Sequence, residues 1–92
     1  MEVIINEKFT TALRKLKNPQ VDRQVLDIVE NVLSAQSLRD IRQIKKLKGS
    51  KSAYRIRVQD YRIGIIVEND VVEFIDIGHR KNIYNRFPPK NS

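Results

Sequence analysis

The first third of the chain contains one short apolar run and two stretches with the apolar spacing of a helix. Val3–Ile5 is typical of a short strand. Asn6 is a suitable N-cap for a first helix, and Asn18 followed by Pro19 ends that helix and begins a second, which we expect to reach about Gln36. The apolar stripes of these helices are Phe9, Ala12, Leu13 and Leu16 in the first, and Val21, Val25, Ile28, Val29, Val32 and Leu33 in the second.

In the second half of the chain the apolar period changes to two, which predicts strands. Three strands are expected, over Tyr54–Val58, Tyr61–Glu68 and Val71–Gly78. Two-residue turns typical of hairpins, Gln59-Asp60 and Asn69-Asp70, join them.

Together these elements predict a single α+β domain over residues 1–92. It consists of an N-terminal strand, a helical hairpin and an antiparallel three-stranded meander, with the helices packed on one face. The segment Leu38–Lys48 fits neither period, because its apolar residues recur every three positions, and it is either a short helical turn or an extended connector. Pro88-Pro89 marks the end of order, so residues 88–92 are expected to form a disordered tail.

Strand pairing divides the first hairpin into two faces of different character. The core face carries Tyr54, Ile56, Val58, Tyr61, Ile63, Ile65 and Val67. The other face places Arg57 opposite Arg62, and Arg55 opposite Gly64. Because like charges directly opposite one another are destabilising, these guanidinium groups predict an anionic ligand, and their planar forks suit phosphate. The alternative is that they extend separately into water.

Two positions depart from regular strands. The bare backbone of Gly64 is typical of a β-bulge or of the close approach of another group. In the third strand, strict alternation would place Asp76 in the core beside Phe74. Either a bulge shifts the register there or Asp76 has a buried polar partner, and both possibilities stay open.

The net charge of +7 is concentrated in two parts of the chain. Residues 1–38 are neutral overall, residues 39–62 carry +7, residues 63–78 carry −4 and residues 79–92 carry +4. Such a distribution indicates a polyanionic partner. The candidate phosphate-binding lysines are Lys45, Lys46, Lys48, Lys51 and Lys81. For this group, the alternative is an ordinary solvated surface.

Composition restricts the remaining possibilities. The chain has no cysteine and one histidine, so neither disulfides nor a metal cofactor is expected. It has no apolar run long enough for a membrane span, and its N-terminus lacks the basic region of a secretory signal. We therefore expect a cytoplasmic protein.

The segment GHRKNIYNRFPP follows the last predicted strand. We expect His79, Arg80 and Lys81 at the edge of the arginine-bearing face. Tyr84 follows Arg80 by one helical turn, so the two project together if Lys81–Phe87 is a short helix. A tyrosine that stacks on a base beside an arginine that holds phosphate suits RNA, although Tyr84 could instead pack against the sheet, and His79 could be an ordinary surface residue.

The run YRIRVQDYRIGIIVENDVVEFIDIGHRKNIYNRF resembles the C-terminal half of RelE/ParE-superfamily toxins of type II toxin–antitoxin systems, and the preceding helical hairpin is similar as well. The resemblance implies a RelE-type mRNA interferase that cleaves mRNA in the ribosomal A site without a metal. The nucleophile would be the 2′-hydroxyl of the RNA. A small RelB-like antitoxin is the implied partner, with a monomeric free toxin and a hetero-oligomeric complex.

The resemblance also assigns candidate site residues. Arg55 and Arg57 match the basic pair on the first meander strand, although RelE itself carries lysines there. Arg62 and Arg80 match the family's other arginines, and Tyr84 matches its tail tyrosine.

Cleavage of this kind needs a base, an acid and stabilisation of the charge that builds on the phosphate. Arginine supplies the charge but does not give up its proton, whereas histidine has an ordinary pKa near neutral. His79 is therefore predicted as base or acid, with Arg62 and Arg80 on the phosphate and Tyr84 orienting the base or ribose. The alternatives are a ParE-type DNA gyrase inhibitor that acts by protein–protein contact, and a catalytically decayed RNA-binding relative.

Overall fold

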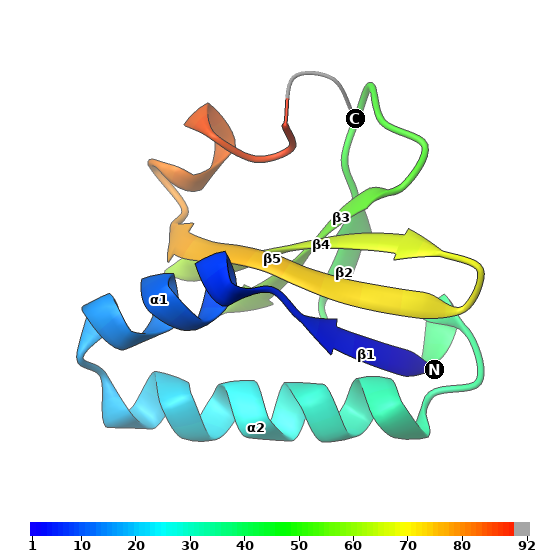
Figure 1. The fold of residues 1–92 in the computed structure, drawn as a ribbon, viewed down its shortest axis with the longest axis horizontal. Helices are drawn as coiled ribbons and strands as arrows, with labels where there is room; N and C mark the ends of the chain where they lie inside the picture. Colours follow the sequence, from blue (N-terminus) through cyan, green and yellow to red (C-terminus); the bar gives the residue numbers. More distant parts are fainter. Residues whose placement is uncertain (90–92) are drawn as a thin grey trace.

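The structure, a computed structural model, describes residues 1–89. In chain order its elements are β1 (Glu2–Ile5), α1 (Glu7–Leu16), α2 (Pro19–Ser34), the 3₁₀ turn η1 (Leu38–Asp40), β2 (Ile44–Lys46), β3 (Ala53–Val58), β4 (Tyr61–Glu68), β5 (Val71–His79) and the 3₁₀ turn η2 (Ile83–Asn85). The strands form one mixed sheet in the order β1-β5-β4-β3-β2. Helices α1 and α2 cover one face of this sheet (Figure 1), which confirms the α+β class. Of the predicted tail 88–92, residues 90–92 lie outside the described part of the chain.

Both helices begin at the predicted caps. The Asn6 side chain accepts a hydrogen bond from the backbone N–H of Lys8 (2.8 Å). The Asn18 side chain accepts from the backbone N–H groups of Gln20 and Val21 (3.1 and 3.2 Å). Each asparagine thus satisfies N–H groups that have no partner within the helix. In residues 1–89, neither helix has the combination of length and apolar character needed to cross a bilayer.

The apolar stripe of α2 is narrower than predicted. Val21 and Val32 are fully buried, but Leu33 is 55% exposed, so its predicted place in the core is wrong. Consecutive helical residues point about 100° apart, and a helix on a sheet buries only one stripe of its surface. Helix α2 also ends at Ser34, slightly before the predicted end.

The first hairpin has the predicted register. In the β3–β4 ladder Arg57 pairs with Arg62, and Arg55 pairs with Gly64. On the opposite face, Ile56 and its neighbours join the core beneath the helices. The arginines therefore stand together on the face that the helices leave uncovered.

The ambiguous segment 38–48 contains both a helical turn and a strand. After η1, strand β2 pairs antiparallel with β3, with Lys45 opposite Arg55 and Lys46 opposite Tyr54. Strand β1 pairs in parallel with β5. The expected three-stranded meander is thus the centre of a five-stranded sheet. With only three residues, β2 is too short for a period of two to be visible in the sequence.

A register shift and a polar side-chain partner are both found at Asp76, although the partner is not buried. The register shifts next to Gly64, which faces Asp76, while Ile65 faces Phe74, so one residue of β5 is extra. The Asp76 side chain is only 1% exposed, and the Nε atom of Arg86 lies 2.7 Å from its Oδ2. The aspartate is therefore both displaced by a bulge and paired with the guanidinium of Arg86, whose own side chain is 43% exposed.

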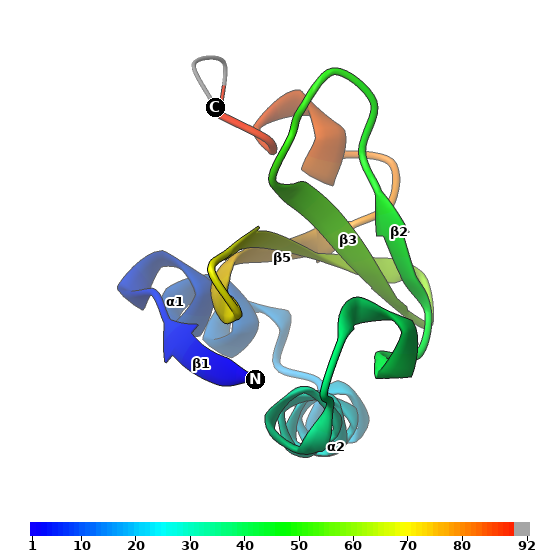
Figure 2. The ribbon, with the colours of Figure 1, turned by 90° about the vertical axis from the view of Figure 1, so that its right-hand side faces the viewer.

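The C-terminal turn covers part of the sheet face opposite the helices (Figure 2). Ile83 and Phe87 are buried there against Ala53, and together they form a second, smaller apolar cluster. The Phe87 ring lies 2.6 Å from where a Cβ on Gly64 would be. The close approach that Gly64 indicates is thus made by the chain's own C-terminal segment.

Candidate functional site

A hollow lined mostly by cations lies where β2, β3 and β4 meet the C-terminal turn. This basic hollow, of about 620 Å³, is lined by Lys45, Lys46, Leu47, Lys48, Arg55, Arg62, Arg80, Lys81 and Tyr84. None of these residues is acidic. Seven positive side chains therefore surround one space that opens to solvent on the sheet face left free by the helices.

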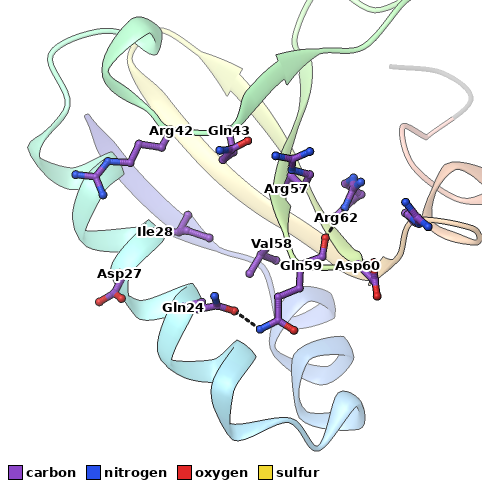
Figure 3. A pocket seen from close by; sticks show the side chains of 11 residues that line it. Gln24, Asp27, Ile28, Arg42, Gln43, Arg57, Val58, Gln59, Asp60 and Arg62 are labelled. Atoms are coloured by element: carbon purple, nitrogen blue, oxygen red, sulfur yellow. Dashed lines mark hydrogen bonds between the residues drawn. The ribbon is translucent and has the colours of Figure 1, made fainter.

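A second hollow adjoins the first, on the side of helix α2 (Figure 3). This glutamine hollow, also about 620 Å³, is lined by Gln24, Asp27, Ile28, Arg42, Gln43, Arg57, Val58, Gln59, Asp60, Arg62 and Arg80. Because Arg62 and Arg80 line both spaces, a ligand held by these two arginines could extend into either hollow.

Backbone carbonyls orient two of the guanidinium groups. The Nη1 atom of Arg62 donates to the carbonyls of Gln59 (3.0 Å) and Tyr61 (2.8 Å). The Nη1 atom of Arg55 donates to the carbonyl of Gln43 (2.7 Å). The φ of residue Gln43 is 62°, in the left-handed region. Carbonyl dipoles hold these side chains in place without cancelling their charge, and the remaining N–H groups stay available.

Carboxylates do not neutralise this arginine cluster. Within residues 1–89 the ion pairs are those of Asp76 with Lys8 and Arg86, so Arg57, Arg62 and their neighbours in the hollows have no carboxylate at ion-pair distance. Among residues 1–89, no three histidine, aspartate or glutamate side chains lie close enough together to hold a metal ion. Uncompensated guanidinium groups that share one space favour an anion with several acceptor oxygens, such as phosphate.

Most of the predicted site residues lie together, as the hairpin register and the tail pattern indicated. The basic hollow contains Lys45, Lys46, Lys48, Arg55, Arg62, Arg80, Lys81 and Tyr84. Arg57 lies beside Arg62 in the glutamine hollow. The Tyr84 side chain is 48% exposed, so its ring is accessible to a ligand. Lys51 is exposed in the loop before β3 and lines neither hollow.

His79 does not lie with the arginines, and its predicted placement at their edge is wrong. Gly78 faces Arg62 in the β4–β5 ladder, so the next residue, His79, faces Tyr61 on the helix-covered side of the sheet. The two rings meet edge to face with centroids 6.0 Å apart. The Nδ1 atom of His79 accepts a hydrogen bond from the backbone N–H of Lys81 (3.2 Å). The imidazole thus supports the turn after β5 and lines neither hollow.

For the RNA cleavage that the sequence resemblance implies, replacing His79 with glutamine is expected to leave the rate within about threefold of that of the unsubstituted protein, because a lost general acid or base costs about a hundredfold or more. Cleavage of ribosome-bound message by the purified variant is the measurement. A hundredfold loss of cleavage rate with an unchanged melting temperature would show that His79 acts as the general acid or base.

Sequence reasoning missed the polar residues of the glutamine hollow. Gln24 lies on α2 and Gln59 in the β3–β4 turn, 35 residues apart, yet their side chains meet. No spacing along the chain connects two such positions. A glutamine in a two-residue turn, where glycine or asparagine is usual, is the one sign that could have singled out Gln59.

Comparisons with known proteins agree over almost the whole chain. A family model described as the ParE toxin of the type II toxin–antitoxin system parDE matches residues 3–84. Toxin RelE3 of Methanocaldococcus jannaschii is 38% identical over 89 residues, which cover 96% of this chain and 100% of that relative. The RelB–RelE antitoxin–toxin complex from Methanococcus jannaschii contains a chain with a similar fold, with a TM-score of 0.78 and 36% identity over 92% of this chain and 99% of that one. The isolated Escherichia coli RelE toxin has a TM-score of 0.62 and 23% identity over 92% of each chain.

Proposed function

Because this chain belongs to the RelE/ParE superfamily and is a RelE-type toxin of a type II toxin–antitoxin system, we propose that it is an endoribonuclease that cleaves mRNA and so inhibits translation. The observation that carries the proposal is the basic hollow, where seven cations and an exposed tyrosine surround a space without a carboxylate. The proposed substrate is mRNA in the ribosomal A site.

In the proposed reaction the 2′-hydroxyl of one nucleotide attacks the adjacent phosphorus, and the bond from phosphorus to the 5′-oxygen breaks. The hydroxyl proton passes to a base, and the 5′-oxygen takes a proton from an acid. Negative charge builds on the non-bridging oxygens in between. Arg62 and Arg80, which line both hollows, are placed to stabilise that charge.

The other residues of the basic hollow have supporting roles in this proposal. Tyr84 stacks on a base, and Arg55, Arg57 and the lysines hold neighbouring phosphates. The titratable groups that line the basic hollow are the lysines and Tyr84, so proton transfer is assigned to this set, since arginine keeps its proton.

The proposed partner that controls this activity is a small RelB-like antitoxin. Structures of relatives in RelB–RelE complexes are known, and the chain of the Methanococcus jannaschii complex that matches this one is 36% identical to it. An antitoxin that covers the basic surface would exclude RNA from it. We further propose that the free toxin is a monomer that acts in the cytoplasm, where its substrate lies.

Mapping mRNA ends in cells tests the proposal. The toxin is expressed alone and together with its antitoxin, and the 5′ ends of cellular messages are sequenced. New ends within codons are expected soon after induction of the toxin alone and should disappear when the antitoxin is present. Intact messages in cells whose growth has stopped would contradict mRNA cleavage.

Inhibition of DNA gyrase is the second candidate function, because the family model that matches residues 3–84 describes ParE toxins. Purified gyrase separates the two. A ParE-type inhibitor would block supercoiling and induce DNA damage signalling, whereas an interferase would leave supercoiling unchanged. An RNA-binding relative without activity would bind message and leave its ends intact.

A further inference from the structure

We infer that the glutamine hollow receives one nucleobase of the bound RNA, and that Gln24 and Gln59 read the edge of that base. The inference rests on the proposed function, because it takes RNA to be the ligand of the adjoining arginines. It assigns a specificity-determining site on α2 and the β3–β4 turn, beside the proposed reaction centre.

The glutamine hollow has the chemical layout of a nucleotide site. Arg57, Arg62 and Arg80 supply positive charge on one side. Ile28, half-buried on α2, supplies an apolar wall against which a base can lie, whereas Val58 beside it is 5% exposed and adds little surface (Figure 3). A volume of about 620 Å³ falls within the roughly 300–1,000 Å³ of typical small-ligand sites.

The two glutamine side chains form a preorganised polar edge. The Nε2 atom of Gln59 donates to the Oε1 atom of Gln24 at 2.7 Å (Figure 3). This bond leaves the Gln59 carbonyl free to accept and the Gln24 amide free to donate. Amide side chains recognise adenine by one donated and one accepted hydrogen bond, and single-stranded RNA is commonly read by its base edges.

Asp27 biases the hollow toward bases with an exocyclic amino group. It follows Gln24 by about one turn of α2 and lines the same space. Its carboxylate only accepts hydrogen bonds, and within residues 1–89 it has neither a hydrogen-bond nor an ion-pair partner. Two acceptors, from Asp27 and Gln59, therefore favour adenine, which carries an amino group, over uracil, which has none.

The backbone of Gln59 has a conformation that it shares with Lys17, Gln43, Asn69 and Asp70 and that glutamine seldom adopts. Its φ is 55°, in the left-handed region that glycine and asparagine normally occupy. Glutamine there carries conformational strain, and strained residues cluster at functional sites.

The test uses adenosine and uridine 5′-monophosphates, with inorganic phosphate as the probe of the arginines alone. Binding to the full-length protein is measured at low salt by NMR titration. We expect adenosine monophosphate to bind about fivefold more tightly than uridine monophosphate, the effect of about one hydrogen bond. The largest base-dependent shifts are expected at the backbone amides of Gln24 and Gln59.

Gln24→Ala and Gln59→Gly should each reduce that preference, with the remainder coming from Asp27, and leave phosphate binding unchanged. Alanine suits the interior of α2, and glycine removes the strain at position 59, so neither variant should unfold the protein. Gln20→Ala, an exposed residue of the same helix outside the hollow, is the matched control and should keep the preference.

Equal binding of the two nucleotides by the unsubstituted protein would overturn the inference, as would a preference that neither substitution reduces. Failure of the proposed function is a separate result. A protein that prefers adenosine monophosphate but leaves messages intact supports the base site and contradicts cleavage, whereas cleavage without any base preference does the reverse.

Discussion

Replacing Arg62 with alanine is expected to reduce RNA cleavage by roughly 10²–10³-fold, the usual cost of removing one preorganised donor from a charge-stabilising site. Arg62 lines both hollows, and two carbonyls hold its Nη1 atom in place, so the guanidinium needs little reorganisation to reach a phosphate. Arg80→Ala should have an effect of the same order, because Arg80 also lines both hollows. Single-turnover cleavage of ribosome-bound message is the measurement.

The loss should be catalytic and not structural. Arg62 is half-buried, and the carbonyls it leaves can bond to water, so the free energy of unfolding should change by less than about 1 kcal/mol. Arg23→Ala removes the same charge from an exposed position of α2 outside both hollows and should retain full activity. Equal losses in the two variants would mean that net charge alone, and not the hollow, supports cleavage.

Replacing Arg86 with alanine is expected to lower the free energy of unfolding by about 2–4 kcal/mol, since it leaves a buried carboxylate without its close partner. Asp76 is 1% exposed, and after the loss of Arg86 the next cation is the Lys8 ammonium at 3.7 Å. Arg86 also donates to the Ile77 carbonyl, and its guanidinium occupies the place that a Cβ on residue 78 would take. Urea unfolding followed by circular dichroism measures the change.

The Arg86→Ala substitution should also lower the cleavage rate. Arg86 bonds to Asp76 and Ile77 of β5 and so holds the C-terminal turn, which contains Arg80 and Tyr84, in place against the sheet. The double variant Asp76→Asn with Arg86→Ala is the control. An amide can stay buried without a charged partner, so the double variant should be more stable than Arg86→Ala alone. An Arg86→Ala protein as stable as the original would show that this ion pair contributes nothing to holding the C-terminal turn.

Local patterns predicted much of the proposed site. The two-residue turn after Val58 sets the register of the first hairpin, and that register alone brings Arg57 opposite Arg62. Arg80 and Tyr84 both line the basic hollow, although the short helix expected over Lys81–Phe87 is only the 3₁₀ turn Ile83–Asn85. The predicted position of His79 was wrong because successive residues of a strand point to opposite faces of the sheet. Gly78 faces Arg62, so His79 lies on the opposite face from the arginines.

The sequence by itself determined the helix starts, the hairpin register and the cluster of arginines, because each depends on residues a few positions apart. Only the tertiary structure decided the pairing of β1 and β2 with the sheet and the Asp76–Arg86 ion pair. It also decided the packing of the Phe87 ring against Gly64 and the hydrogen bond between Gln59 and Gln24. Those contacts join distant residues. Their geometry follows from how the bulge, the sheet and the helices pack together, which no local period records.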